Sequence, residues 1–273
     1  SVQRLGFPQA GLEDPVHEVE VHYAITRNPC RNIVQQYDKF LTREMLGDGA
    51  NRVDCQCVWT ALEFCADGEL FDFISERSVQ QITIPEVQAC SYAYQVLQAV
   101  RAIFASGHVH LDISLENVLL TDNQQTAKIC DFGMARKYRP NEPFPGHRAR
   151  QPGKKGYRAP EICAGQDFYG PSADMWSCGV LIFILLTGMP PYEEANDSDP
   201  RFKCLFTDRN LKLLLRHWGF IGHPNGPRQQ LSDAAVDLVS RLLVPAAERF
   251  TVDQALNHAW FAPLRLAEAQ AHA

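Results

Sequence analysis

The chain has 273 residues, of which 45% are hydrophobic and 10% aromatic, and its formal net charge is −6. This composition is typical of one large domain or two closely packed ones with a substantial core, and it excludes a disordered chain. The acidic balance argues against a nucleic-acid-binding surface.

The nine cysteines do not follow a disulfide or zinc pattern. Cys55 and Cys57 are separated by one residue, and no second cysteine pair or histidine pair completes a zinc site. We find no signal peptide. The cysteines are therefore expected to be reduced, mostly buried thiols in a cytoplasmic protein.

The N-terminal third is predicted to contain a tail, one helix and two strands. Residues 1–13 show no sustained period and should form a tail or loop. Acidic residues and Pro15 then suit the start of a helix over residues 16–25. Strands are expected over residues 32–37 and 57–62, with a polar, glycine-bearing insertion at 41–54 between them.

The rest of the chain is predicted to be mainly helical. Thr83 and Glu86 have the spacing of a capping box, and Gly107 should end the helix that follows. Residues 173–186 are apolar nearly all round, which indicates a central buried helix. The longest apolar run, residues 179–186, is too short to span a bilayer, so no membrane span is expected. Later helices should begin near Arg209, Ser232 and Thr251, and Thr251 opens a second capping box with Gln254.

Three short motifs carry the chemistry. In the stretch from His110 to Asn117, the carboxylate of Asp112 and the amide of Asn117 are five residues apart. Asp131-Phe132-Gly133 and Ala159-Pro160-Glu161 follow in that order. A carboxylate can accept the proton of a hydroxyl group, and carboxylate and amide oxygens are suitable ligands for Mg²⁺.

These motifs resemble the catalytic loop, the metal motif and the end of the activation segment of eukaryotic protein kinases of the serine/threonine type. The resemblance covers most of the chain. It implies an α+β, protein-kinase-like bilobal fold with a truncated small β lobe and a large, mainly helical lobe. Residues 14–65 would form the partial small lobe with its C-helix and hinge, residues 66–263 the large lobe, and residues 264–273 a C-terminal tail.

The resemblance also implies roles for single residues. Asp112 would be the catalytic base, and Asn117 and Asp131 would hold Mg²⁺. His110 would pack behind Phe132, and Asp174 would anchor the backbone of the catalytic loop. The residues implied to lie at ATP are Glu18, Leu62, Glu63, Cys65, Glu69, Glu116 and Asp131. The residues implied to hold the site in shape are His110, Phe132, Gly133, Glu161, Asp174 and Arg249, with an ion pair between Glu161 and Arg249. Glu69 and Glu116 match positions that contact ribose or basic substrate residues, and a solvated glutamate is the open alternative at both.

The chain departs from the family pattern in its first part and in the catalytic loop. It has no G-x-G-x-x-G loop, and residues 1–38 contain no lysine, so the strand lysine that pairs with the position of Glu18 is missing. Leu111 replaces the arginine that reads a phosphorylated activation segment. Residues 132–158 contain no Ser or Thr, and only Tyr138 and Tyr157 could accept phosphate there.

Ser114 and Lys154 form a further departure. Ser114 stands where the family places a lysine near the transferred phosphate, and Lys154 stands where it places a threonine that hydrogen-bonds the catalytic aspartate. We predict that the two have exchanged roles, with Lys154 reaching toward Asp112 as the catalytic cation. A solvated lysine beside Lys155 is the open alternative.

The expected function is transfer of the γ-phosphoryl group of ATP, with Mg²⁺, to serine or threonine hydroxyls of proteins. The alternative is a pseudokinase or a truncated kinase fragment that acts as a binding scaffold. Because the chain begins with Ser1 and lacks the glycine-rich loop, we expect an N-terminally incomplete domain. The basic composition of residues 136–158 is compatible with acidic substrates. The sequence leaves the substrate, the regulator and the oligomeric state open.

Overall fold

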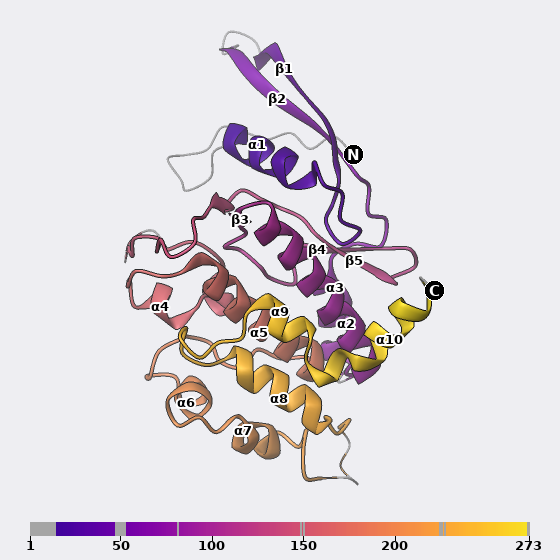
Figure 1. Cartoon of the computed structure of the whole chain (residues 1–273), viewed down its shortest axis with the longest axis vertical. Helices are drawn as coiled ribbons and strands as arrows, with labels where there is room; N and C mark the ends of the chain where they lie inside the picture. The colour runs from indigo at the N-terminus through magenta and orange to yellow at the C-terminus, as the bar shows by residue number, and fades with distance from the viewer. Residues whose placement is uncertain are drawn as a thin grey trace.

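A computed structural model describes residues 15–46, 53–80, 82–147, 149, 151–223, 226 and 228–271. A small part, formed by one helix and a long hairpin, lies above a larger and mainly helical part (Figure 1). The first elements are α1 (Pro15–Thr26), β1 (Gln36–Leu46), β2 (Val53–Leu62), α2 (Leu70–Val79) and α3 (Glu86–Ala105). This α+β arrangement of two parts is the expected one. The tail predicted for residues 1–13 lies outside the described residues.

The small part has longer strands than the sequence predicts. Strands β1 and β2 form a two-stranded antiparallel sheet in which Gln36 lies opposite Leu62 and Leu46 opposite Val53. The insertion predicted for residues 41–54 is therefore wrong where the structure describes it. Cross-strand contacts explain the difference, because Phe40 stacks on Trp59 and the indole of Trp59 donates a hydrogen bond to Thr42 at 2.8 Å. The expected helix over residues 16–25 is confirmed as α1.

Short strands at the top of the large part carry the loops of the predicted site. Strand β4 (Val118–Thr121) pairs antiparallel with β5 (Thr126–Ile129), and β3 (His108–Val109) pairs with β6 (Arg136–Lys137). The loop from 110 to 117 thus runs between β3 and β4, and residues 130–135 run between β5 and β6. Both segments predicted to carry chemistry are anchored at each end by strand pairing.

Helices α3 and α5 (Gly170–Thr187) pack against each other at the centre of the large part (Figure 1). Almost every side chain of α5 is buried, including Trp176 and Phe183. With 18 residues, α5 is longer than the apolar run in the sequence. Among the described helices, it alone is long and apolar enough to cross a membrane. Because 83% of it is buried inside the fold, it is the core helix that the sequence predicts.

The remaining helices complete the lower part and the C-terminal side. They are α4 (Pro160–Cys163), α6 (Pro200–Phe202), α7 (Leu211–His217), α8 (Asp233–Leu242), α9 (Val252–Leu256) and α10 (Ala262–Ala271). Short helical turns lie at Lys155–Tyr157, Lys203–Thr207 and Ala259–Phe261. Of the segment expected as a C-terminal tail, residues 264–271 belong to helix α10, and Tyr94 of α3 donates a hydrogen bond of 2.8 Å to Glu268.

The two predicted capping boxes have different outcomes. At α9, Thr251 and Gln254 form the reciprocal hydrogen bonds of a capping box, as predicted. At α3, the cap residue is Pro85, no side chain caps the helix, and the box predicted from Thr83 is wrong. The carboxylate of Glu86 instead accepts hydrogen bonds from Ser232 N at 2.8 Å and from the indole of Trp260 at 2.9 Å. Because Glu86 binds these distant residues, its side chain does not form the local capping box.

Candidate active site

The catalytic-loop backbone is fixed by the buried carboxylate of Asp174, near the start of α5. Its two oxygens accept hydrogen bonds from His110 N at 2.7 Å and Leu111 N at 2.8 Å, which confirms the predicted anchor. Burial raises the pKa of Asp174 to about 7, and the two N–H donors oppose that rise. Leu111 itself has a φ of 63°, a left-handed conformation that the two hydrogen bonds help to hold.

Asp112 is held by donors on both of its carboxylate oxygens. Lys154 N donates to Oδ1 at 2.8 Å, and the Asn117 side-chain amide donates to Oδ2 at 2.9 Å and to the Asp112 carbonyl at 2.8 Å. Burial raises the pKa of Asp112, while the hydrogen bond from Asn117 lowers it. A half-buried carboxylate fixed in this way has the geometry of a proton acceptor.

Asn117 and Asp131 provide oxygen atoms that fit Mg²⁺. Asn117 uses its amide nitrogen on Asp112, and an amide oxygen such as its Oδ1 is a suitable ligand for Mg²⁺. Asn117 O accepts a hydrogen bond from Cys130 N at 3.0 Å, so the loop with Asn117 is tied to the residue before Asp131. No cluster of three or more His, Cys, Asp or Glu ligands occurs among the described residues. Proteins commonly bind Mg²⁺ through one or two protein oxygen atoms, and phosphate oxygens complete the coordination of the ion.

The ring of Phe132 contacts two buried histidines. Its centroid is 5.1 Å from that of His110 and 4.6 Å from that of His22 in α1. His110 Nδ1 accepts from Asp112 N, so its Nε2 carries the hydrogen that is donated to Cys130 O at 3.1 Å. The predicted packing of His110 behind Phe132 is confirmed.

His22 was missed by the sequence analysis. Its Nε2 donates to Val34 O at 2.6 Å, and burial lowers its pKa from 6.5 to about 4. The signal was its place four residues after Glu18, which puts both side chains on one face of α1. Gln36 of β1 was missed as well: it is 2% exposed, and its amide has no hydrogen-bond partner among the described residues.

Four of the seven residues predicted at ATP act on the pKa of Cys130, which precedes the metal motif. Burial raises the pKa of Cys130, and the negative charges of Asp131, Glu69 and Glu18 add to the rise. Glu18 from α1 and Glu69 before α2 therefore lie within electrostatic range of one cysteine, together with Cys65, the last hinge residue.

The side chain of Glu63, which is predicted to lie at ATP, is bound to other parts of the protein. Its carboxylate accepts from Gln35 N at 3.1 Å and lies 2.9 Å from Lys128 Nζ. The Glu63 side chain therefore ties the hinge to β5, and its main-chain nitrogen donates to Gln35 O at 2.8 Å. Leu62 ends β2 directly opposite the buried Gln36.

The structure gives Lys154 a different partner from the one predicted. Its main-chain nitrogen contacts Asp112, but its ammonium lies 2.5 Å from Glu116 Oε1. Asp112 already has a donor on each oxygen, whereas Glu116 offers a partly exposed carboxylate. Ser114 is 1% exposed, and its hydroxyl has no hydrogen-bond partner among the described residues. The predicted exchange of catalytic roles between Ser114 and Lys154 stays a prediction.

The activation segment is docked by close main-chain contact and by the predicted ion pair. Gly153 has a φ of +83°, and a Cβ there would lie 2.6 Å from Leu111 O, so only glycine fits without a shift. Arg249 binds Glu161 through two hydrogen bonds of 2.7 and 3.2 Å, and its fully buried guanidinium lies over Trp176. Gly133 N donates to Asp131 Oδ1 at 3.2 Å, which fits its predicted structural role.

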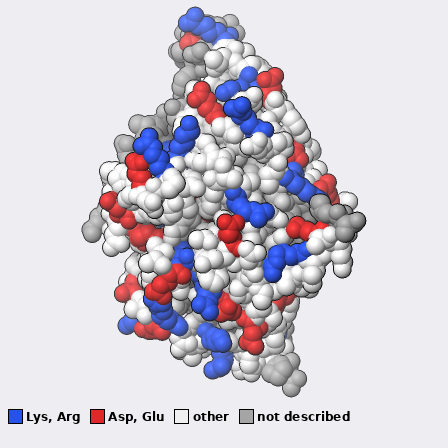
Figure 2. Space-filling model, viewed as in Figure 1, with Lys and Arg blue, Asp and Glu red and all other residues white. Residues whose placement is uncertain are grey.

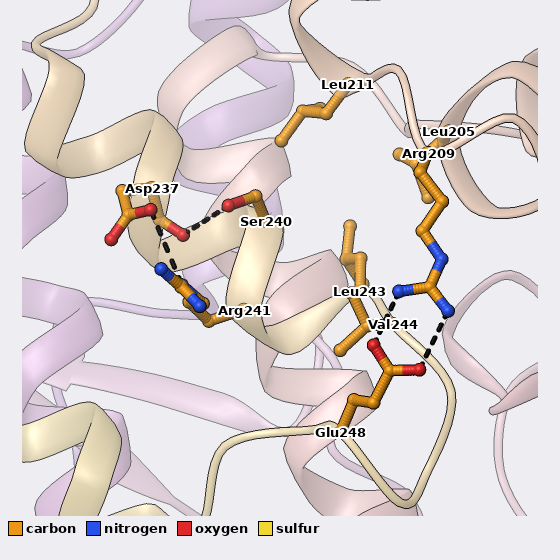
Figure 3. A pocket seen from close by; sticks show the side chains of 9 residues that line it. All are labelled: Leu205, Arg209, Leu211, Asp237, Ser240, Arg241, Leu243, Val244 and Glu248. Carbon is orange, nitrogen blue, oxygen red and sulfur yellow. Dashed lines mark hydrogen bonds and ion pairs between the residues drawn. The ribbon is translucent and has the colours of Figure 1, made fainter.

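A pocket of about 590 Å³ lies apart from these residues, between α8 and the segment that leads into α7 (Figure 3). None of the predicted site residues lines it. Its charged side chains are paired with one another: Arg209 binds Glu248 at 2.6 and 2.8 Å, and Arg241 lies 3.5 Å from Asp237. This pocket therefore offers no uncompensated charge to a ligand.

Comparison with known proteins agrees with this geometry. Residues 9–261 match the model of the protein kinase domain. The chain is 36% identical over 243 residues to the probable serine/threonine-protein kinase fhkC of Dictyostelium discoideum, and these cover 87% of this chain and 35% of that protein. It is 31% identical over 252 residues to calcium-dependent protein kinase 17 of Arabidopsis thaliana, covering 91% of this chain and 41% of that protein. The chain thus spans well under half the length of these relatives.

Proposed function

Since this chain belongs to the protein kinase family, we propose that the complete protein is a serine/threonine kinase that phosphorylates other proteins. The observation that carries the proposal is the arrangement of Asp112, held between Lys154 N and the Asn117 amide, on a loop tied to Cys130, the residue before Asp131. Members of the family use ATP and Mg²⁺ in general. The retained Asp112, Asn117 and Asp131 favour this proposal over the pseudokinase alternative.

In this proposal each residue has a limited task. Asp112 orients the acceptor hydroxyl and takes its proton as the phosphoryl group leaves ATP. Asn117 Oδ1 and the Asp131 carboxylate would hold Mg²⁺, which neutralises charge on the phosphates when bound. The docked segment that ends at Glu161 keeps Lys154 N on Asp112, so the carboxylate stays in place.

We also propose protein substrates of acidic or neutral character. Three of the basic residues in the segment 136–158, namely Arg139, Lys154 and Lys155, form ion pairs with glutamates. Less unpaired positive charge therefore remains than the sequence alone indicates. On the face shown in Figure 2, basic and acidic side chains are interspersed, which supports a protein rather than a nucleic-acid partner. Eight of the nine cysteines, those whose side chains the structure describes, are free thiols, which supports a cytoplasmic location.

The test is phosphotransfer by the full-length protein. Radiolabelled ATP with Mg²⁺ is offered together with casein, an acidic protein, and with histone, a basic one. Label on serine and threonine, with casein preferred, is the expected result. Label confined to tyrosine, or no transfer from ATP to any protein, would refute the proposed activity.

A further inference from the structure

Lys154 connects two carboxylates at the place where an acceptor would meet Asp112. Its main-chain nitrogen lies 2.8 Å from Asp112 Oδ1, and its ammonium lies 2.5 Å from Glu116 Oε1. One lysine is therefore long enough to span the proton acceptor and a second carboxylate beside it. A basic side chain next to the acceptor hydroxyl would find Glu116 within the same reach.

The carboxylate of Glu116 has one oxygen available to a ligand. Its Oε2 is buried and has no hydrogen-bond partner among the described residues, so solvent reaches the group through Oε1. The Glu116 side chain is 23% exposed, and Lys154 Nζ lies on Oε1. Without Lys154, this oxygen would present an unpaired negative charge at the rim of the site and would attract a cation.

The neighbouring residue repeats the pattern. Lys155 Nζ lies 2.5 Å from Glu194 Oε1, and both residues line a groove of about 460 Å³ together with Arg158 and Phe202. Two consecutive lysines of the activation segment thus neutralise glutamates that come from two different parts of the fold. A freely solvated basic loop would not be expected to place both ammonium groups in this way.

We propose that Lys154 is a specificity-determining residue: its ammonium takes the place of a basic substrate side chain at Glu116, so the enzyme does not select basic residues there. The acceptor segment is then neutral or acidic beside the phosphorylated hydroxyl. This inference rests on the proposed phosphotransfer and assigns the residue pair, Lys154 and Glu116, that sets the substrate class.

The test measures binding, so that it does not depend on turnover. Fluorescein-labelled peptides carry a central serine in an otherwise neutral sequence, and a single arginine is placed at each flanking position in turn. Affinities for the full-length protein are measured by fluorescence anisotropy. The parent protein should bind the arginine-containing peptides no more tightly than the neutral peptide. Lys154→Gln should gain at least tenfold in affinity from arginine at one position, and adding Glu116→Gln should abolish that gain.

Lys155→Gln is the matched control, because it removes the same charge from the adjacent residue and leaves the Lys154–Glu116 pair intact. Any gain that it produces should persist when Glu116→Gln is added. The proposal is wrong if the parent already prefers arginine through Glu116, or if Lys154→Gln shows no gain. Thermal melts establish that each variant is folded. Because phosphotransfer is assayed separately, loss of activity with this binding pattern would reject the kinase function and keep the inference.

Discussion

At the scale of single residues, the site depends on carboxylates whose oxygens each have a defined donor. Asp174 receives two main-chain N–H groups, and Asp112 receives one main-chain and one side-chain N–H. These contacts fix the direction of the Asp112 carboxylate before a substrate arrives, which lowers the entropic cost of reaching a reactive geometry.

Replacing the proposed base tests that arrangement. Asp112→Asn keeps the shape of the side chain and removes the proton acceptor, so phosphotransfer by the full-length protein should fall by about 10²–10⁴-fold, roughly 3–5 kcal/mol, with folding intact. Steady-state assays with saturating ATP measure the effect. Asp122→Asn, at an exposed turn, is the matched control and should leave the rate unchanged. A rate for Asp112→Asn within a factor of two of the parent would remove Asp112 from this role.

At the scale of elements, the ion pair between α4 and the segment before α9 fixes the end of the activation segment. Arg249 is fully buried as a side chain and also donates to Ser172 O and Val244 O. Arg249→Leu would leave the Glu161 carboxylate, 12% exposed, without its cation, so the free energy of unfolding should fall by about 3–5 kcal/mol.

Urea unfolding of the full-length protein measures this loss. Arg209→Leu is the control, because it breaks an ion pair of similar geometry whose side chains are about half exposed. The control should change stability far less, since water already screens that pair. Equal losses in the two variants would contradict the importance given to burial.

Helix α1 should make stability depend on pH through His22. Burial lowers the pKa of His22 from 6.5 to about 4, so the folded state favours the neutral ring. This stabilisation is complete above pH 6.5 and is lost as the pH falls through about 4, a total of about 3 kcal/mol. The unfolding free energy measured between pH 7 and pH 4 should therefore fall less steeply in His22→Leu than in the parent. His223→Gln, at an exposed position, should keep the parent's slope.

Short motifs predict structure correctly where the contacts of their residues are local or are part of the protein kinase family pattern. The helix α1, the core helix α5, the Thr251 box and the contacts of Asp174, His110 and Arg249 were all predicted. The predictions failed where distant partners decide the outcome. Strand β1 extends through a polar stretch because β2 pairs with it, and Glu86 leaves the predicted cap for Ser232 and Trp260. The contact between the ammonium of Lys154 and Glu116 also depends on tertiary structure, because no periodicity in the sequence brings the two together, and the predicted exchange of roles with Ser114 stays a prediction.

At the scale of the whole molecule, the described small part covers the site with one helix and a two-stranded sheet. Residues 1–38 contain no lysine to bind the α- and β-phosphates. We therefore expect this 273-residue chain alone to bind ATP with Mg²⁺ weakly or not at all, although the hinge and the oxygen ligands are present. Titration calorimetry measures this directly, and a dissociation constant in the low-micromolar range would contradict the prediction.

The contact between Glu86 and Trp260 has a consequence for the order in which the protein is made. The two residues are 174 positions apart, and translation at ordinary speeds takes roughly 9 to 35 seconds to cover that distance. In the course of this interval α3 leaves the ribosome before its partners are synthesised. These partners are Trp260, which binds Glu86, and helix α9, which packs against α3. The large lobe therefore cannot close around its central helix pair until nearly all of this chain has emerged, and a nascent chain would expose that apolar surface to chaperones until then.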